Sequence, residues 1–167
     1  MIESPVHKQT LAKVFCDPRE LAVRLEAFRL TNRIVLVKGA YDLFHIGHYY
    51  SFVGARTFGN VLVVAVNDDA SIRARKNTER PVLALEDRMI LIAALACVDF
   101  VTTYDAPSPF EVISLLRPHV FAASHFESLT QEQRADLQKT TEFQFVPKLG
   151  GTSTTSIIKK LKGLPNA

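Results

Sequence analysis

Residues 33–48 read RIVLVKGAYDLFHIGH, and this stretch decides the fold. Its branched apolar run, Ile34 to Val37, predicts a short strand buried on both faces. Gly39 follows the strand and lets the backbone turn tightly. A helix is predicted from near Ile46 to about Phe58, because a glycine-asparagine pair then ends the pattern. The stretch is therefore a strand, a turn and a helix, which is the repeating unit of an α/β fold.

The same alternation continues to the end of the chain. Buried strands separated by helices predict an α/β fold with a doubly wound, five-stranded parallel sheet and right-handed crossovers. In such sheets ligands bind beyond the carboxyl ends of the strands, where the strand order reverses. The remaining predicted strands are 61–66, 100–104, 119–122 and 143–146. The helices predicted after the one at 46–58 are 85–96, 109–116, 130–139 and 153–161.

Residues 1–31 are expected to stand apart from this pattern. Residues 1–16 show no periodicity and are interpreted as a loose arm. Asp17 and Pro18 suit the N-cap and the first position of a short amphipathic helix over 18–30. The main domain is therefore expected to cover 32–167, a size that fits one hydrophobic core.

The composition favours a cytoplasmic protein with neither a membrane nor a nucleic acid as partner. A formal net charge of +3 is small for a nucleic-acid binder, and the basic residues are dispersed apart from clusters at 73–76 and 159–162. These clusters are either a generic basic surface or a means of neutralising phosphate on a small ligand. No apolar run could span a bilayer, and no secretory signal is visible. Cys16 and Cys97 are interpreted as free thiols in a reducing cytosol.

Two histidines, His45 and His48, flank the predicted start of the helix after Gly39, with Gly47 between them. The unpaired N–H groups and the positive dipole end of a helix favour an anion at this place. Histidine suits phosphoryl transfer because it donates hydrogen bonds to oxygens that gain charge and titrates near neutrality. The pattern therefore predicts a phosphate-handling site at this turn, with Asp42 beside it.

Simpler interpretations of the same residues remain open. Two histidines near a helix start can cap the helix, and Gly39 can be an ordinary turn at the end of a strand. Zinc binding would need a third ligand of the right kind, and none lies nearby in the sequence, so no metal site is predicted. The ligand-site interpretation rests on the conjunction of the glycine turn, Asp42 and H-x-G-H at the edge of the sheet where ligands bind.

A second phosphate cradle is predicted near residue 153, after a pair of glycines. Ser153, Thr154 and Thr155 offer hydroxyl groups at a predicted helix start, whose first N–H groups lack partners within the helix. A plain N-cap is the alternative, and it would need only one of these residues.

The stretch G-x-Y-D-x-x-H-x-G-H at 39–48 resembles the signature of the cytidylyltransferase-like nucleotidyltransferase superfamily. Three more segments resemble the family in the same order, and the resemblance covers about 32 to 162. Within the superfamily, the pattern is most similar to the adenylyltransferase domain of the bifunctional ADP-heptose synthases and less similar to glycerol-3-phosphate cytidylyltransferases. The three segments are VVAVNDDAS at 63–71, RPV followed by E-x-R at 80–88, and GTSTTSII at 151–158.

This resemblance implies a Rossmann-like fold and a transfer reaction. A nucleoside triphosphate and a phosphorylated small-molecule acceptor would give a nucleoside-diphosphate conjugate and pyrophosphate. His45 and His48 would hold the α- and β-phosphate oxygens, and Lys76 would neutralise the leaving pyrophosphate. Mg²⁺ would accompany the triphosphate and be held mostly by its phosphates. Because family members often dimerise, a homodimer is possible. The implied nucleotide contacts are Gly39, Ala40, Tyr41, Asp42, Gly47, Arg88, Ser153, Thr154 and Thr155.

Two segments depart from the family pattern. Relatives carry a glycine-rich acidic turn after the fourth strand, whereas this chain has Ser124-His125-Phe126. His125 is interpreted either as a substitute contact to acceptor or phosphate, or as an ordinary loop residue. Lys148 lies where cytidylyltransferases have an arginine, and it could meet a phosphate. The asparagine-glycine-cysteine of the heptose enzymes is replaced by Lys38-Gly39-Ala40.

The favoured function is an adenylyltransferase that uses ATP and a sugar phosphate such as heptose 1-phosphate. The alternatives are a cytidylyltransferase for glycerol 3-phosphate or phosphoethanolamine, an FMN adenylyltransferase, and a degenerate module that only senses nucleotide. H-x-G-H also occurs in class I aminoacyl-tRNA synthetases. Those enzymes need a lysine-rich K-M-S-K-S loop, a tRNA-binding region and much greater length, and none of these fits in 167 residues, so a tRNA ligase is not favoured.

Overall fold

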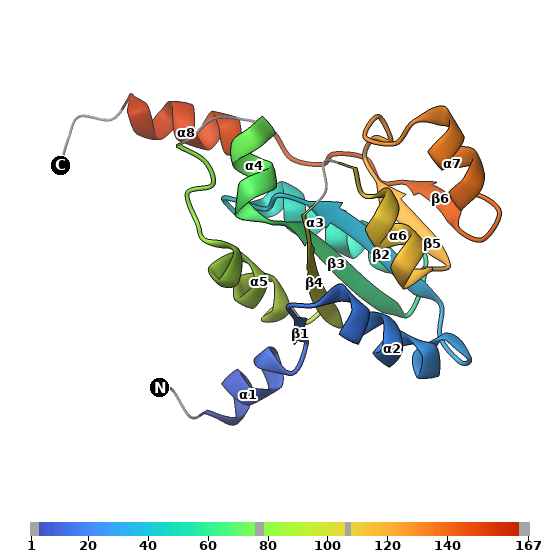
Figure 1. Cartoon of the computed structure of the whole chain (residues 1–167). Helices are drawn as coiled ribbons and strands as arrows, with labels where there is room; N and C mark the ends of the chain where they lie inside the picture. The colour runs from blue at the N-terminus through green and yellow to red at the C-terminus, as the bar shows by residue number, and fades with distance from the viewer. Residues whose placement is uncertain (1–3, 76–78, 106–107, 164–167) are drawn as a thin grey trace.

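The computed structural model describes residues 4–75, 79–105 and 108–163. Within these residues, six parallel strands form one sheet in the order β1-β4-β3-β2-β5-β6 (Figure 1). All five predicted strands are present, and the doubly wound α/β fold is confirmed. The strands are β1 (Val14–Phe15), β2 (Ile34–Gly39), β3 (Val61–Asn67), β4 (Phe100–Tyr104), β5 (Val120–Ala123) and β6 (Glu142–Phe145).

The strand order reverses between β2 and β5, near the middle of the sheet. From β2 the chain builds outward through β3 to β4, then returns to build β5 and β6 on the other side. Leu36 of β2 is in register with Val63 of β3 and with Phe121 of β5. The carboxyl ends of these strands therefore meet at one edge, which is the edge where sheets of this type bind ligands.

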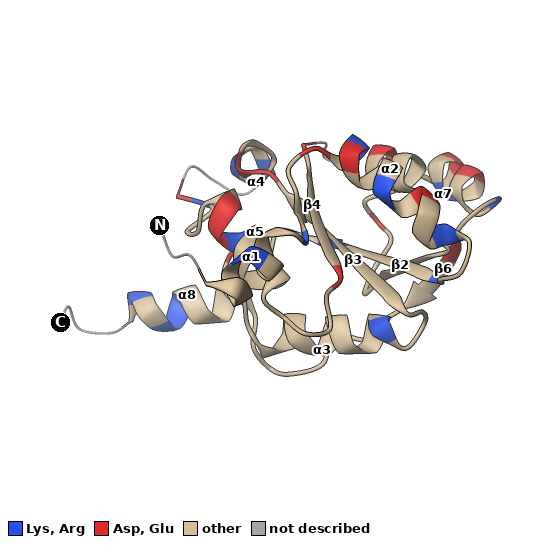
Figure 2. Ribbon diagram, turned by 90° about the horizontal axis from the view of Figure 1, so that it is seen from below, with Lys and Arg blue, Asp and Glu red and all other residues tan. Residues whose placement is uncertain are grey.

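Helices cover both faces of the sheet. Side chains of α3 and α5 pack on one face, and those of α2, α6 and α7 pack on the other. Figure 2 shows α3 on one side of the strands and α2 and α7 on the opposite side. The helices are α1 (Pro5–Leu11), α2 (Pro18–Arg29), α3 (Ile46–Arg56), α4 (Asp69–Arg75), α5 (Leu85–Ala93), α6 (Phe110–Leu116), α7 (Gln131–Leu137) and α8 (Thr154–Lys162).

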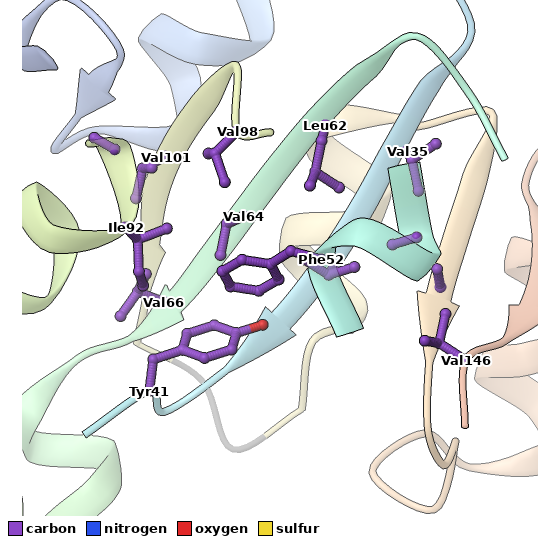
Figure 3. Packing of buried hydrophobic residues seen from close by; sticks show 14 of the residues in the cluster. Val35, Tyr41, Phe52, Leu62, Val64, Val66, Ile92, Val98, Val101 and Val146 are labelled. Atoms are coloured by element: carbon purple, nitrogen blue, oxygen red, sulfur yellow. The ribbon is translucent and has the colours of Figure 1, made fainter. Parts of the chain in front are cut away.

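The central strand β3 is buried along its whole length, as its apolar run predicts. Val64 points toward α3 and α5 and packs beside Phe52 of α3 (Figure 3). Its neighbour Val63 belongs to the core on the opposite face. Since successive residues of a strand point to opposite faces, a strand between two helical layers must be apolar at every position.

The N-terminal residues do not form the loose arm that the sequence suggests. Val14 and Phe15 form the edge strand β1, which pairs with β4 through Val14↔Val101. The side chain of Lys13 donates to the carbonyl of Val98 at 2.8 Å. A strand of two residues is too short to show a periodicity, and its stability comes from pairing with β4. The sheet thus extends into residues 1–31.

The short helices α1 and α4 are also missed by the sequence analysis, and α4 lies next to the candidate site. Helix α4 follows β3 directly, and Ser71 N–H donates to the Asp68 carboxylate at 2.8 Å to start it. In the described residues, no helix is both long enough and apolar enough to cross a membrane.

Candidate functional site

The turn after β2 is built around a close approach between Gly39 and the Tyr41 ring. A methyl group added to Gly39 would lie 2.8 Å from Cζ of Tyr41. Tyr41 has a φ of 48° and is buried, and its ring packs edge-on against His48. The same ring packs edge-on against Phe52 (Figure 3). Gly39 therefore leaves space for the ring, and this ring supports one of the two histidines.

Gly39→Ala is expected to destabilise the chain by about 1–3 kcal/mol, because the added methyl group overpacks the Tyr41 ring. Urea unfolding would measure the change. Gly151→Ala is the matched control, since a methyl group there meets nothing within 4 Å. A loss at Gly39 no larger than that at Gly151 would contradict this account of the turn.

His45 and His48 both cap α3 and face each other across its first turn. Nδ1 of His45 accepts from Gly47 N–H at 3.1 Å, and Nδ1 of His48 accepts from His45 N–H at 3.4 Å. Their rings stack with centroids 3.8 Å apart. Because each Nδ1 accepts a hydrogen bond, the proton of each neutral ring lies on Nε2. Capping and phosphate handling are therefore compatible, since the cap fixes the tautomer that makes Nε2 a donor.

Burial lowers the pKa of His45 below its ordinary value. The neutral ring keeps Nδ1 as an acceptor, whereas protonation would turn it into a donor and break the cap. The pKa of this ring is lower in the folded chain than in the unfolded chain, where it is about 6.5. The neutral ring therefore contributes to stability above about pH 6.5, and this contribution is lost as the pH falls below that value. His119 and His125 also have lowered pKa values, first through burial and then through nearby basic side chains.

The melting temperature is therefore expected to fall as the pH is lowered from about 7.5 to about 5.5. Asparagine places an amide oxygen near the position of Nδ1 and does not titrate, so His45→Asn should make this decline smaller. Calorimetry across the pH range would measure both. An unchanged slope in His45→Asn would show that His45 does not contribute.

Asp42 and Arg88 are buried, each 1% exposed, and both hold loops together. The Asp42 carboxylate pairs with Arg80 and accepts from the N–H groups of Val82 and Leu83 at 2.6 and 3.1 Å. It thereby ties the turn after β2 to the segment before α5. Arg80 is a residue that the sequence analysis did not assign to the site.

The Arg88 guanidinium donates to the carbonyls of Ala40, Asn67 and Leu83 and to the Asp69 carboxylate. These acceptors include the residue that follows β2 and the last residue of β3. The sequence predicts a nucleotide contact for Arg88. Four hydrogen bonds to the protein occupy this fully buried side chain, so it holds the ends of β2 and β3 together, and its contact with a nucleotide stays a prediction.

The loop before α8 brings the second predicted phosphate-binding segment close to the first, which lies at the start of α3. A methyl group on Gly47 would lie 3.2 Å from the Leu149 carbonyl, and one on Gly150 would lie 3.6 Å from Cγ2 of Ile46. The chain therefore passes over the start of α3 before it enters α8. Ser153 caps α8 by accepting from Ser156 N–H at 3.1 Å.

Ser153 therefore acts as the N-cap, which is the alternative interpretation of this segment. Within the described residues, the hydroxyl groups of Thr154 and Thr155 are not used in this cap. Their contact with a nucleotide stays a prediction. Lys76, the predicted triphosphate ligand, lies outside the described residues.

The turn after β5 is anchored to the core by an aromatic ring. The ring of Phe126 packs against Phe121 and Phe143, with centroids 5.8 and 5.2 Å away. His125 is exposed and its Nδ1 lies 3.2 Å from Oγ of Ser124. Lys148 is also exposed, beyond the end of β6. The turn is thus fixed to the core while its polar side chains stay at the ligand-binding edge.

Lys38 is a site residue that the sequence analysis quoted but did not assign. Its Nζ donates to Oγ of Ser128 at 3.0 Å, across the point where the strand order reverses. The sequence feature that could have identified Lys38 was the presence of a lysine within an otherwise apolar strand. Arg75 lies at the same edge, where it donates to Oδ1 of Asn67 at 3.1 Å.

The model of the family described as Cytidylyltransferase-like matches residues 36–160, a span that contains all the site residues described above. The chain belongs to this cytidylyltransferase-like family. Its H-x-G-H motif at 45–48, the turn after β5 and the first residues of the final helix all lie inside the matched region.

The cytidylyltransferase-like chain is similar to longer bacterial proteins named Bifunctional protein HldE. The protein from Geotalea uraniireducens (strain Rf4) is 37% identical over 135 residues, which is 78% of this chain and 27% of that protein. The one from Aliarcobacter butzleri (strain RM4018) is 31% identical over 166 residues, which is 96% of this chain and 33% of that protein. The chain therefore spans a third or less of the length of these relatives.

A solved structure with the same fold is the lipopolysaccharide core biosynthesis protein from Thermoplasma volcanium GSS1. It superposes with a TM-score of 0.61 at 22% identity, over 71% of this chain and 99% of that chain. At this identity, the likeness supports the α/β architecture of the cytidylyltransferase-like chain.

Proposed function

We propose that the chain is a nucleotidyltransferase that joins a nucleoside monophosphate to a phosphorylated small molecule. The stacked pair of His45 and His48 carries this proposal. Both rings lie at the start of α3, at the strand ends beside the reversal point of the sheet, and the bonds to Nδ1 place the proton of each neutral ring on Nε2. Membership of the cytidylyltransferase-like family supports the same reaction.

In the proposed reaction, an oxygen of the acceptor phosphate attacks the α-phosphorus of the triphosphate in line. The new bond joins that oxygen to the α-phosphorus, and the bond to the β-phosphate oxygen breaks, so that pyrophosphate leaves. Positioning and electrostatics supply most of the catalysis in such transfers. His45 and His48 would stabilise charge on the α- and β-phosphate oxygens. Lys76 and the start of α8 would meet the departing phosphates.

Magnesium is proposed to arrive with the triphosphate and to neutralise its charge. In residues 4–75, 79–105 and 108–163, no group of three His, Cys, Asp or Glu side chains is placed to hold a metal ion. The buried carboxylate of Asp42 is already paired with Arg80. The phosphates themselves would therefore provide most of the ligands to the ion.

ATP and a sugar phosphate such as heptose 1-phosphate are the proposed substrates. Resemblance to the adenylyltransferase domain of ADP-heptose synthases supports this choice. A cytidylyltransferase acting on glycerol 3-phosphate or phosphoethanolamine is the second candidate, and an FMN adenylyltransferase is the third. The second is retained because the family model that matches this chain is described as cytidylyltransferase-like.

A thermal-shift screen with ATP, CTP, GTP and UTP, each with magnesium, tests the nucleotide. Selective stabilisation by ATP is expected, since a ligand that binds only the folded state raises its stability. Pyrophosphate release with heptose 1-phosphate, glycerol 3-phosphate, phosphoethanolamine and FMN then tests the acceptor. Nucleotide binding without pyrophosphate from any pair would favour a sensing module over an enzyme.

A further inference from the structure

Three basic side chains lie at the ends of three adjacent strands. Lys38 is the last residue but one of β2, His125 follows the end of β5 by two residues, and Lys148 follows the end of β6 by three. β5 is paired with both β2 and β6, and all three strands are parallel. Their carboxyl ends therefore place these three side chains at the same edge of the sheet.

Lys38 is a partly buried cation that lacks a carboxylate partner among the described residues. Its Nζ donates to the neutral hydroxyl of Ser128, and no described Asp or Glu lies within 4.0 Å of it. Burial, and then the charge of Arg75, lower the pKa of Lys38. Burying a charge without a counter-ion is unfavourable, so an anion bound beside Lys38 would be stabilised.

Lys38 contacts the segment that carries His125, because its Nζ donates to Oγ of Ser128, three residues further along the chain. Burial is the largest cause of the lowered pKa of His125, and the charges of Lys38 and Lys148 lower it further. The nearby Glu127 acts in the opposite direction. A phosphate dianion among these groups would favour protonated His125, because an opposite charge stabilises the charged form.

We propose that Lys38, His125 and Lys148 form a subsite for the phosphate of the acceptor, and that the acceptor carries no cationic group. This inference rests on the proposed transferase function and assigns the acceptor's place within it. His45 and His48 lie after the same strand β2, so an acceptor phosphate held by Lys38 lies beside the nucleotide phosphates. A cationic acceptor such as phosphoethanolamine would place its ammonium group near two lysines, and like charges repel. The subsite therefore favours sugar and polyol phosphates.

Binding of inorganic phosphate, followed by NMR of the His125 ring, tests the subsite. The titration is made on the whole chain, once alone and once with magnesium and a nucleotide analogue. The analogue is the α,β-methylene form of the nucleotide that stabilises the chain in the thermal-shift screen. We expect phosphate to raise the pKa of His125. Lys38→Met should weaken phosphate binding about tenfold or more, as loss of a charged hydrogen bond predicts, and Lys38→Arg should restore most of it. Lys139→Met, at an exposed lysine paired with Asp136, is the matched control.

The outcomes separate this inference from the proposed function. Absence of a His125 response, or an equal response in Lys38→Met, would overturn the subsite even if nucleotide binding and pyrophosphate release are intact. Absence of nucleotide binding with a normal His125 response would instead count against the transferase. Should Lys38→Met fail to fold, Lys148→Met at an exposed position gives the same test, with a smaller loss expected.

In the active enzyme, Lys38→Met should raise the KM for glycerol 3-phosphate about tenfold or more while the KM for the nucleotide stays near that of the wild type. The preference for glycerol 3-phosphate over phosphoethanolamine should fall in the same variant. A purely structural role of Lys38 would change both KM values together, and that result would count against the subsite.

Discussion

His48→Asn is expected to lower kcat by about 10²–10³ while stability and nucleotide affinity stay close to those of the wild type. Asparagine places its amide oxygen near the position of Nδ1, so it can still accept from His45 N–H, which lies 3.4 Å from that atom. What it removes is the Nε2–H donor. The effect should therefore appear in kcat, because the donor acts on charge that develops in the transition state.

His48→Gln is the matched variant, because glutamine carries an amide N–H near the position of Nε2. Its kcat should be higher than that of His48→Asn. Steady-state kinetics with the preferred nucleotide and acceptor would measure both, and urea unfolding would confirm that both variants fold. An unchanged kcat in His48→Asn would remove this ring from the mechanism.

The fold was predictable because its evidence in the sequence is local. Apolar runs of strand length and helices with recognisable starts alternate through the chain, and they fix a doubly wound sheet. The edge strand β1 could not be predicted, because two residues carry no periodicity and the pairing partner lies far along the chain. The same limit applies to α4, a short helix that follows a strand without a loop.

The sequence indicates which residues lie in the turn after β2, but it does not indicate which contacts each side chain makes. The motif identifies Asp42 and Arg88, yet only coordinates show that both are buried and satisfied by the protein. Residue identity does not reveal the direction of a side chain. In the sequence, helix capping and phosphate handling look like exclusive interpretations of His45 and His48. The structure shows that both residues cap α3 in a way that is compatible with phosphate handling. Lys38 was visible as a charge inside an apolar strand, but its neighbours come from β5 and β6.

Arg88→Met is expected to destabilise the chain by about 3–5 kcal/mol, the usual cost of breaking a buried charged network by removing one partner. Methionine fills much of the same space but donates nothing. The carbonyls of Ala40 and Asn67 would lose the N–H donor they share, and Asp69 would lose its partner. Arg73→Met, at an exposed position of α4, is the control, with a change within about 0.5 kcal/mol.

The same variant separates positioning from direct contact. If Arg88 positions the ends of β2 and β3, the folded fraction of Arg88→Met should keep a nucleotide KM within about threefold of the wild type, while kcat falls because His45 and His48 follow the displaced turn. If Arg88 touches the nucleotide, KM should rise while the free energy of unfolding changes little. Urea unfolding and steady-state kinetics on one preparation distinguish these results. Loss of a positioning residue must lower the free energy of unfolding, whereas loss of a direct contact to the nucleotide need not.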